Sequence, residues 1–358
     1  MAEGTADVPG RERRRRDTRL QRGGVRRRRD PRDAGYVDRI YAIDDRSTDG
    51  TRAEIREAAR EDAIGNVGRV DEAGERLAAD GGASALATRA TVGDAIGRVV
   101  PIQHRENRGA GGAIKTGYLA ALADGVDATV TVDADGQMDL RQMQRLLDPI
   151  VEGEADYTKG NRLLSREYRA AMPRFRLVGN ATLTFLTKIA SGYWKTMDPQ
   201  NGYTAISHDA LAAIDVPALY EYYGYCNDLL VKLNVHGMRV ADVAMPAVYG
   251  EEESSITYSR YVPKVSLLLL RDFLWRLRTK YLVLDCHPLA LLYLFGAATA
   301  ATAVLGAGTA LGSAFSSGGV PAVRVATSLL LLVAGIGFLL LAMVFDMAES
   351  EPLETQVR

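Results

Sequence analysis

Cysteine is scarce in this sequence of 358 residues, which contains two, Cys226 and Cys286. Two thiols do not make a disulfide framework or a cysteine-ligated metal cluster, which excludes the small proteins held together in those ways. We interpret both as buried or membrane-embedded thiols. Net charge is also low, at -1, so the whole-chain balance indicates no class of partner.

The N-terminus lacks the apolar core of a secretory signal peptide. Residues 11–32 are instead crowded with arginine, including four in a row at 13–16 and again at 26–29. These like charges repel one another and no apolar periodicity interrupts them, so we predict that residues 1–35 form a disordered Arg-rich tail. The alternative is a patch for nucleic acid or anionic lipid, although we expect no nucleic acid among the partners of the whole chain.

Charged residues are absent from two long stretches near the other end of the chain, at 288–315 and 325–345. Each exceeds the roughly 18–20 apolar residues that a helix needs to cross the hydrocarbon of a bilayer. We therefore predict two transmembrane helices within residues 285–346, followed by an acidic tail at 347–358. A buried helical hairpin of a soluble protein is the alternative interpretation.

Residues 37–43 are typical of a β-strand and lead through a polar turn into a predicted helix over 51–61. The turn carries three carboxylates, Asp44, Asp45 and Asp49. A strand, a carboxylate-rich turn and a helix make half of a βαβ unit. Residues 62–98 are rich in Gly, Ala and Asp and are predicted to form a surface insertion with one short helix near 72–79.

A second strand over 99–104 runs into a glycine-rich segment and then a helix that extends to about residue 124. Asn107 and Gly109 open the segment, and Lys115 follows in the helix. Glycines before a helix let the backbone come close to a phosphate, and the helix N-terminus attracts the anion. Tight strand-to-helix turns also use glycine, so this pattern alone leaves both interpretations open.

The most informative stretch is a buried-strand pattern at 129–132 that is followed by Asp133, Asp135 and Gln137. Side chains at i and i+2 of a strand point the same way, and the carboxyl end of a strand reaches the crevice where open α/β sheets bind ligands. Two aligned carboxylates repel each other unless a cation lies between them. A divalent metal carrying a diphosphate meets that need, and the alternative is a strand that ends in a polar turn.

The remaining soluble elements are expected in the order strand 156–162, helix 174–191, turn-rich segment 194–203, strand 204–207, helix 227–236 and strand 240–245. Residues 256–284 mix Trp, Tyr and aliphatic side chains with Arg and Lys, which suits amphipathic helices in the membrane interface. An ordinary surface helix is the alternative. The basic residues of this segment predict, by the positive-inside rule, that the soluble part and both termini are cytoplasmic.

From residue 36 to about residue 280 the chain resembles a family 2 glycosyltransferase, and most closely the polyprenyl-phosphate sugar transferases of the dolichyl-phosphate mannose and glucose synthase type. Five motifs in the family's order carry the resemblance. Residues 43–51 are similar to V-D-D-G-S-x-D-x-T, and residues 107–117 are similar to N-x-G-x-G-A-A-x-x-x-G. Residues 133–137 are similar to D-x-D-x-Q, and residues 159–162 are similar to K-G-S-R. Asn227-Asp228 lies at the position of the family's acidic pair. Each motif is weak alone, and five in order are specific.

The resemblance implies a GT-A fold over 36–255, which is a mostly parallel nucleotide-binding sheet flanked by helices. It implies inverting transfer of a sugar from a nucleotide-sugar donor to a polyprenyl or dolichyl phosphate. Residues 198–203 resemble archaeal-type relatives that use UDP-linked sugars, so we expect a UDP-sugar. The expected partners are the donor, the lipid phosphate and the bilayer, in a multi-pass protein of the cell membrane that serves protein glycosylation.

The resemblance also assigns roles to residues. The nucleotide would contact Asp44, Asp45, Asp49, Asn107, Gly109, Lys115 and Asp133. Asp135 and Gln137 would hold Mg²⁺ or Mn²⁺, which neutralises the departing diphosphate as a Lewis acid. The acceptor phosphate would meet Lys159, Arg162, Arg260 and Lys264.

Asp228 and Asp135 are the catalytic candidates that the resemblance indicates. A phosphate acceptor is already ionised at neutral pH, because its second pKa is near 6. Asp228 would therefore position the acceptor or a cation rather than remove a proton.

The chain departs from the family at its start, where a strand ending in P-x-Y/F-N-E is usual and residues 1–35 contain none. We hypothesise a frame error or a mis-set start there. Arg46 also replaces a family Gly, and Asn227 a family Glu. Two other functions stay open, namely a transferase that makes a membrane polysaccharide on a hydroxyl acceptor and a non-catalytic membrane remnant. A Rossmann dehydrogenase is not expected, because no G-x-G-x-x-G follows a first strand.

Overall fold

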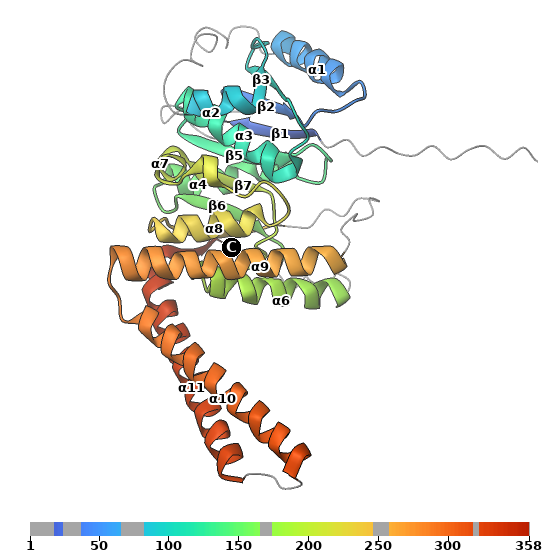
Figure 1. Ribbon diagram of the computed structural model, residues 1–358. Coiled ribbons are helices and arrows are strands. Elements are labelled where there is room, and N and C mark those ends of the chain that lie inside the picture. Colours follow the sequence, from blue (N-terminus) through green and yellow to red (C-terminus); the bar gives the residue numbers. More distant parts are fainter. Residues whose placement is uncertain are drawn as a thin grey trace, which may run out of the picture.

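The computed structural model describes residues 18–23, 37–65, 82–164, 174–245, 258–317 and 322–357. One sheet with helices on its faces forms the soluble part, and two long helices project from one end of it (Figure 1). The sheet has nine strands in the order β3-β4-β2-β1-β5-β7-β6-β8-β9. Their bounds are β1 Thr18–Gly23, β2 Arg39–Asp44, β3 Ala90–Val92, β4 Val99–His104, β5 Ala128–Asp133, β6 Tyr157–Asn161, β7 Thr204–Ser207, β8 Val240–Ala244 and β9 Glu354–Val357.

The helices of the described part fall between these strands or follow them. They are α1 Thr51–Gly65, α2 Gly82–Arg89, α3 Gly109–Asp124, α4 Met143–Val151, α6 Arg174–Ser191, α7 His208–Ala213, α8 Tyr225–Val235, α9 Tyr258–Arg276, α10 Leu289–Ser317 and α11 Ala322–Ser350. The strands expected at 99–104 and 204–207 and the helix expected at 174–191 occur at those bounds. The short helix expected near 72–79 lies outside the described residues.

Strand direction differs from the expected mostly parallel sheet. β2, β4, β5, β6, β8 and β9 run one way, while β1, β3 and β7 run against them. The parallel neighbours are therefore β2–β4, β6–β8 and β8–β9, and the other neighbouring pairs are antiparallel. The sheet is mixed because β1 and β7 each insert between two strands of common direction. The carboxyl ends of the six co-directional strands still meet at one edge, where such sheets bind ligands.

The N-terminal tail differs from its prediction at β1. This strand pairs antiparallel with β2 on one side and with β5 on the other, so it lies in the middle of the sheet. The other residues of 1–35 lie outside the described part. Strand pairing uses the backbone N–H and C=O groups that every residue except proline carries. A segment without apolar periodicity can therefore fill a central position that its side-chain pattern does not predict.

Helix α3 carries the largest buried core on one face of the sheet. Its sequence is rich in Gly and Ala, and residues 111–121 are buried on every side of the helix. A helix without bulky side chains lets its neighbours approach closely, and α3 packs against α2 and α7 as well as the sheet. Strand β5 is likewise buried from Ala128 to Val132, in accord with its Thr and Val residues.

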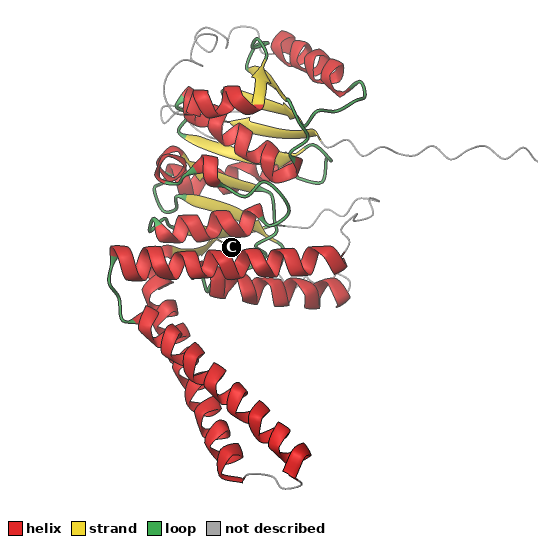
Figure 2. Ribbon diagram, in the orientation of Figure 1, coloured by secondary structure: helices red, strands yellow, loops and turns green. Residues whose placement is uncertain are grey.

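Helix α9 lies against α6 and α8 at the end of the domain from which the long helices project (Figure 2). Val265 and Leu269 of α9 pack on Ala190 of α6 and Val231 of α8. Its opposite side exposes Leu267, Leu270 and Leu274. The helix continues as a π-helical segment, Leu277–Leu284. An apolar outer stripe over a buried inner face is the amphipathic pattern expected at 256–284, and contact of that stripe with a membrane stays a prediction.

Helices α10 and α11 pack against each other along their lengths. Two stretches are long and apolar enough to cross a membrane, Leu289–Ser313 within α10 and Ala322–Leu353, which covers α11 and the three residues after it. The chain then returns to the domain, because β9 adds to the edge of the sheet parallel to β8. The acidic tail expected at 347–358 is therefore partly a strand. The four residues of β9 are mostly polar, so the sequence shows no apolar strand pattern there.

Candidate functional site

Three predicted site segments lie at the same level of the sheet edge. Asp44 of β2 and Asp133 of β5 pair with adjacent residues of β1, Thr18 and Arg19. Strands are spaced about 4.8 Å apart, so the two carboxylate positions are roughly 10 Å apart across β1. Asn161 of β6 shares the level of Asp133, as the pairings of both strands with β7 require. The register thus brings three segments to one edge. They are the acidic turn after β2, the D-x-D segment at 133–135 and the K-G-N-R segment at 159–162.

The acidic turn after β2 is held by hydrogen bonds that its own carboxylates accept. Asp44 accepts from the backbone N–H of Ser47 at 2.8 Å and from Gln103 at 3.0 Å. Asp45 accepts from the backbone N–H groups of Arg108 and Gly109, both at 2.7 Å. Both side chains are buried. Asp45 therefore fixes the N-terminus of α3, although the sequence predicted that it contacts the nucleotide.

The remaining members of the predicted nucleotide set also take part in local structure. His104 Nδ1 lies 2.6 Å from Oδ1 of Asp45, the oxygen that also accepts from Arg108, and Asn107 donates to the carbonyl of Asp45 at 3.2 Å. Gly109 has φ +69°, which favours glycine. Asp49 accepts from the N–H of Thr51 at 3.0 Å, at the start of α1.

The glycines of α3 admit protein backbone rather than an open phosphate cradle. A Cβ at Gly111 would lie 2.7 Å from the carbonyl of Glu221, whose oxygen accepts from Gly112 N–H at 2.8 Å. Lys115 turns to the same loop and donates to the Glu221 carboxylate at 2.9 Å and to the carbonyl of Leu219 at 3.2 Å. The side chain of Lys115 therefore contacts the loop before α8 and not the acidic turn.

The D-x-D segment differs from the expected strand geometry. β5 ends at Asp133, and Asp135 lies in the turn that follows, where Gly136 has φ +74°. Asp135 is exposed and accepts from the N–H of Gln137 at 2.9 Å. The relative direction of the two carboxylates is therefore set by a turn and not by the pleat of a strand.

The donor set at this turn fits a hard divalent cation only in part. Asp133, Asp135 and Gln137 offer oxygen ligands of the kind that Mg²⁺ and Mn²⁺ prefer. Among the residues that the structure describes, no group of three or more His, Cys, Asp or Glu side chains could hold a metal ion. Such a turn suits an ion that takes one or two protein ligands and fills its shell with phosphate oxygens and water.

The two basic residues of the K-G-N-R segment are paired with carboxylates. Lys159 is buried and forms an ion pair with Asp242 of β8 at 2.8 Å. Arg162 is 29% exposed and donates through Nε and Nη2 to Asp198, at 2.7 and 2.8 Å. Burial raises the pKa of the Asp198 carboxyl, but the hydrogen bonds and charge of Arg162 outweigh it and lower that pKa overall. Of the two predicted phosphate contacts, Arg162 reaches the surface and Lys159 does not.

The last two predicted contacts, Arg260 and Lys264, lie in the first turns of α9. Lys264 is exposed, and the side chain of Arg260 lies outside the described part. The structure therefore puts these residues on the helix that packs over α6 and α8, apart in sequence and in element from the K-G-N-R segment.

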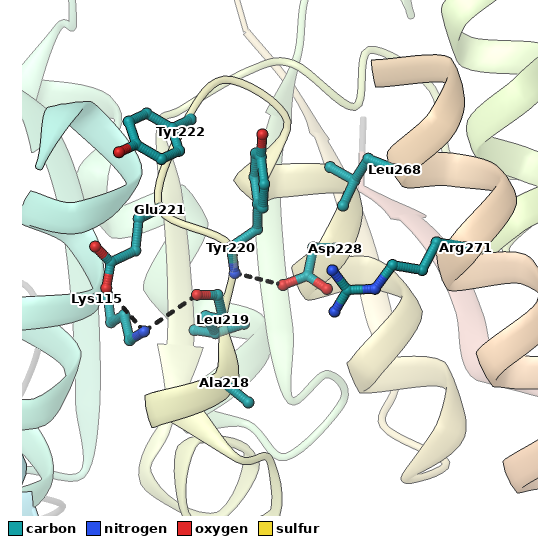
Figure 3. Close-up of a pocket in the computed structure, with 9 residues that line it drawn as sticks. All are labelled: Lys115, Ala218, Leu219, Tyr220, Glu221, Tyr222, Asp228, Leu268 and Arg271. Carbon is teal, nitrogen blue, oxygen red and sulfur yellow. Dashed lines mark hydrogen bonds and ion pairs between the residues drawn. The ribbon is translucent and has the colours of Figure 1, made fainter. Parts of the chain in front are cut away.

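Asp228 lines a pocket of about 260 Å³ between α3, α8, α9 and the loop before α8 (Figure 3). Its carboxylate accepts from the N–H of Tyr220 at 2.8 Å and pairs with Lys232 one turn along α8. Arg271 extends from α9 toward Asp228. The other side chains at the pocket are Lys115, Ala218, Leu219, Tyr220, Glu221, Tyr222 and Leu268.

Two acidic residues of this region were missed by the sequence analysis. Glu221 pairs with Arg89, Arg108 and Lys115, at 3.0, 3.1 and 2.9 Å. Burial raises the pKa of its carboxyl, but the hydrogen bond from Lys115 and the charge of Arg89 outweigh it, and the pKa falls to about 2. For Asp272 of α9, burial and the nearby charge of Asp228 raise the pKa to about 7. Neither residue belongs to a local motif.

In open α/β sheets, the shared carboxyl ends of the strands, where this chain has its carboxylate turn, are the place where ligands bind. Residues 75–215 match the family described as glycosyl transferase family 2. The chain therefore contains a glycosyltransferase family 2 domain, which confirms the GT-A fold class expected from the sequence, with the mixed strand order given above.

Three curated relatives were compared over aligned segments. A UDP-N-acetylglucosamine–dolichyl-phosphate N-acetylglucosaminyltransferase of Methanococcus voltae is 32% identical over 43% of this chain and 61% of its own length. An undecaprenyl-phosphate mannosyltransferase of Micrococcus luteus is 31% identical over 43% and 62%. A polyprenol monophosphomannose synthase of Mycolicibacterium smegmatis is 30% identical over 44% and 59%. The chain thus spans about three fifths of the length of these relatives.

Among solved structures, the chain is similar to glucosyl-3-phosphoglycerate synthase from Mycobacterium tuberculosis in complex with Mn²⁺, UDP-glucose and phosphoglyceric acid. The TM-score is 0.39 and the identity 20%, over 68% of this chain and 70% of that chain.

Proposed function

We propose that the chain transfers a sugar from a nucleotide-sugar donor to a polyprenyl phosphate at a membrane surface. In the reaction, an oxygen of the acceptor phosphate forms a bond to the anomeric carbon. The bond between that carbon and the diphosphate oxygen breaks, and the nucleoside diphosphate leaves with the electron pair. One in-line displacement of this kind inverts the anomeric centre.

The observation that carries the proposal is the turn at Asp133 and Asp135, at the ligand-binding edge of a glycosyltransferase family 2 domain. Asp135 and Gln137 would hold Mg²⁺ or Mn²⁺ there, and the ion, when bound, supplies positive charge to the diphosphate. The protein groups orient the donor. Asp45 and Gly109 keep the neighbouring turn and the start of α3 in place by a hydrogen bond of 2.7 Å.

A phosphate acceptor is supported by the state of Asp228. One of its oxygens accepts from Tyr220 N–H and the other pairs with Lys232, and the residue is 3% exposed. A carboxylate engaged in this way is poorly placed to remove a proton from a hydroxyl. A phosphate needs no such base, because it is ionised at neutral pH. Three relatives are also named for polyprenyl or dolichyl phosphates.

The membrane arrangement follows from the hairpin. Helices α10 and α11 would span the bilayer, and β9 returns the chain to the sheet. The soluble domain and residues 354–357 would then lie on one side, and the basic residues of α9 support a cytoplasmic location for that side. The outer leucines of α9 would rest on lipid. This holds the site over the bilayer and raises the effective concentration of an insoluble acceptor.

The donor is a UDP-sugar in this proposal. The relative from Methanococcus voltae is named for UDP-N-acetylglucosamine, and residues 198–203 carry the D-P-Q-N-G-Y segment. Because two of the relatives are named for the transfer of mannose, GDP-mannose is tested as a donor alongside the UDP-sugars.

The experiment uses the full chain in detergent or lipid with radiolabelled UDP-N-acetylglucosamine, UDP-glucose or GDP-mannose, and with dolichyl phosphate. We expect organic-phase label with one UDP-sugar and its loss in Asp135→Asn. The matched control is Asp209→Asn, which removes an exposed carboxylate in the first turn of α7, at the opposite edge of the sheet. No lipid-linked sugar with any donor would overturn the proposal, and label in a polymer would favour a hydroxyl acceptor.

A further inference from the structure

The segment after the second long helix reaches the site through Glu354. This first residue of β9 is 8% exposed, and its carboxylate accepts three consecutive backbone hydrogen bonds. The donors are the N–H groups of Trp194 and Lys195, both at 2.7 Å, and of Thr196 at 2.8 Å. Hydrogen bonds to an ionised acceptor are about twice as strong as neutral ones. The loop at 194–196 is thus tied to the end of the chain.

The next residue of the loop is held from the neighbouring strand. Met197 N–H donates to Asp242 of β8 at 2.7 Å. In the pairing of β9 with β8, Glu354 lies opposite Val240, which is two residues before Asp242. The carboxylates of Glu354 and Asp242 therefore point to the same face of the sheet. Four consecutive N–H groups are therefore fixed by two carboxylates on adjacent strands. One of these strands exists only because the chain returns after α11.

The loop ends at the ion pair between Asp198 and Arg162. Asp198 follows Met197, has φ +51° and is buried. It holds Arg162 by two hydrogen bonds from the guanidinium, at 2.7 and 2.8 Å. Lys159 donates to the carbonyl of Asp198 at 3.3 Å. The direction of Arg162 is thus fixed through a loop whose other end is fixed by Glu354.

We propose that Glu354 is a positioning residue, which orients Arg162 toward the acceptor phosphate by holding the loop at 194–198. The proposal rests on the proposed function for its acceptor, while the contact between Glu354 and the loop stands by itself. It gives the membrane hairpin a second role, because the same segment that anchors the protein completes the acceptor end of the site.

The kinetic test compares Glu354→Gln with the wild-type full chain. The amide keeps the shape but loses the charge and presents N–H groups to N–H donors. We expect the KM for polyprenyl phosphate to rise about tenfold, with the KM for the nucleotide-sugar within about twofold. The matched control is Glu351→Gln on the same segment, whose pair with Lys195 is exposed, at 66% and 46% for the two side chains. Glu354→Asp should recover part of the acceptor KM.

A double variant decides whether the effect passes through Arg162. If it does, Glu354→Gln adds little to Arg162→Ala, because coupled residues are not additive. Additive losses, or a fall of kcat with both KM values unchanged, would overturn the positioning role.

Fluorescence tests the loop contact without the reaction. The chain has two tryptophans, Trp194 and Trp275, so Trp275→Phe leaves emission from the loop alone. Glu354→Gln in this background should shift that emission to longer wavelength, and Glu351→Gln should leave it unchanged. An unshifted spectrum would overturn the contact. A shifted spectrum in a chain that transfers no sugar would keep the contact, and would refute both the proposed function and the acceptor role built on it.

Discussion

Arg276 of α9 and Asp346 of α11 form a bidentate ion pair in which neither side chain is exposed. Nη1 lies 2.8 Å from Oδ1, and Nη2 lies 2.7 Å from Oδ2. The guanidinium also donates to the carbonyls of Ala190 and Ile189 in α6, at 2.9 and 3.1 Å. One cation therefore joins the soluble domain to the hairpin at a point from which water is excluded, in addition to the contact made by β9.

Removal of one partner of this pair should destabilise the protein strongly. In Arg276→Met the carboxylate of Asp346 stays buried without its cation, which costs about 3–5 kcal/mol. The double variant Arg276→Met/Asp346→Leu should recover most of that loss. Denaturant unfolding in a fixed detergent gives the free energies, and Lys195→Met, which breaks an exposed pair, serves as the control. A single variant that loses less than about 1 kcal/mol would contradict a structural role.

The sequence predicted those parts of the fold whose stability shows in a local pattern. β4 and β7 have buried β-branched residues, and α10 and α11 have long uncharged runs. β1 and β9 lack such patterns, because they are rich in polar residues. Their place in the sheet comes from backbone pairing with distant strands. A sequence reveals such pairing only after the neighbouring strands are known.

The candidate site was predicted in a similarly uneven way. Motifs identified the D-x-D turn and the basic residues Lys159 and Arg162. They did not identify Asp242 and Asp198, the carboxylates that neutralise these cations from other elements. Glu221, which gathers three cations, was missed for the same reason. A buried ion pair is a relation between distant positions, so a local motif that identifies one partner does not identify the other.

Replacement of Arg46 by the residue usual in the family should stabilise the protein. Arg46 has φ +59°, a conformation that costs a non-glycine residue about 1–2 kcal/mol. Glycine removes this strain but gives the unfolded chain more freedom, which offsets about 0.5–1 kcal/mol. We expect Arg46→Gly to gain about 0.5–1 kcal/mol in the free energy of unfolding. Arg46→Val should lose stability by a similar amount, and equal stability of the two variants would argue against a strained turn.

The two catalytic candidates should differ in their effect on turnover. In the proposed function Asp135 helps to hold a cation that neutralises the leaving diphosphate, so we expect Asp135→Asn to lower kcat by about 10²-fold. Asp228→Asn removes a charge that pairs with Lys232 at the pocket, and a phosphate acceptor needs no base. The smaller loss is therefore expected for Asp228→Asn in a radiolabel transfer assay with lipid phosphate. The reverse order would indicate a hydroxyl acceptor.

Stability should fall with rising pH because of Asp272. Burial and the charge of Asp228 raise the pKa of this carboxyl to about 7 in the folded protein, while it stays near 3.8 in the unfolded chain. Below both pKa values, Asp272 is protonated in the folded and the unfolded protein and does not change the free energy of unfolding. Between about pH 4 and 7 the unfolded chain releases the proton first, so stability declines and then stays low. Asp272→Asn should remove this decline in unfolding curves measured from pH 4 to 8, and an identical slope in both proteins would refute the shift.

The cysteines offer a test of membrane orientation. Cys226 is buried in α8, as expected, whereas Cys286 is exposed in the turn between the π-helical segment and α10 and so differs from the buried or membrane-embedded thiol expected from the sequence. A membrane-impermeant maleimide should therefore react with Cys286 alone in the folded protein. With the soluble domain in the cytoplasm, inverted vesicles should be labelled and intact cells should not. Cys286→Ser supplies the unlabelled control, and labelling of intact cells would reverse the orientation inferred from the basic residues of α9.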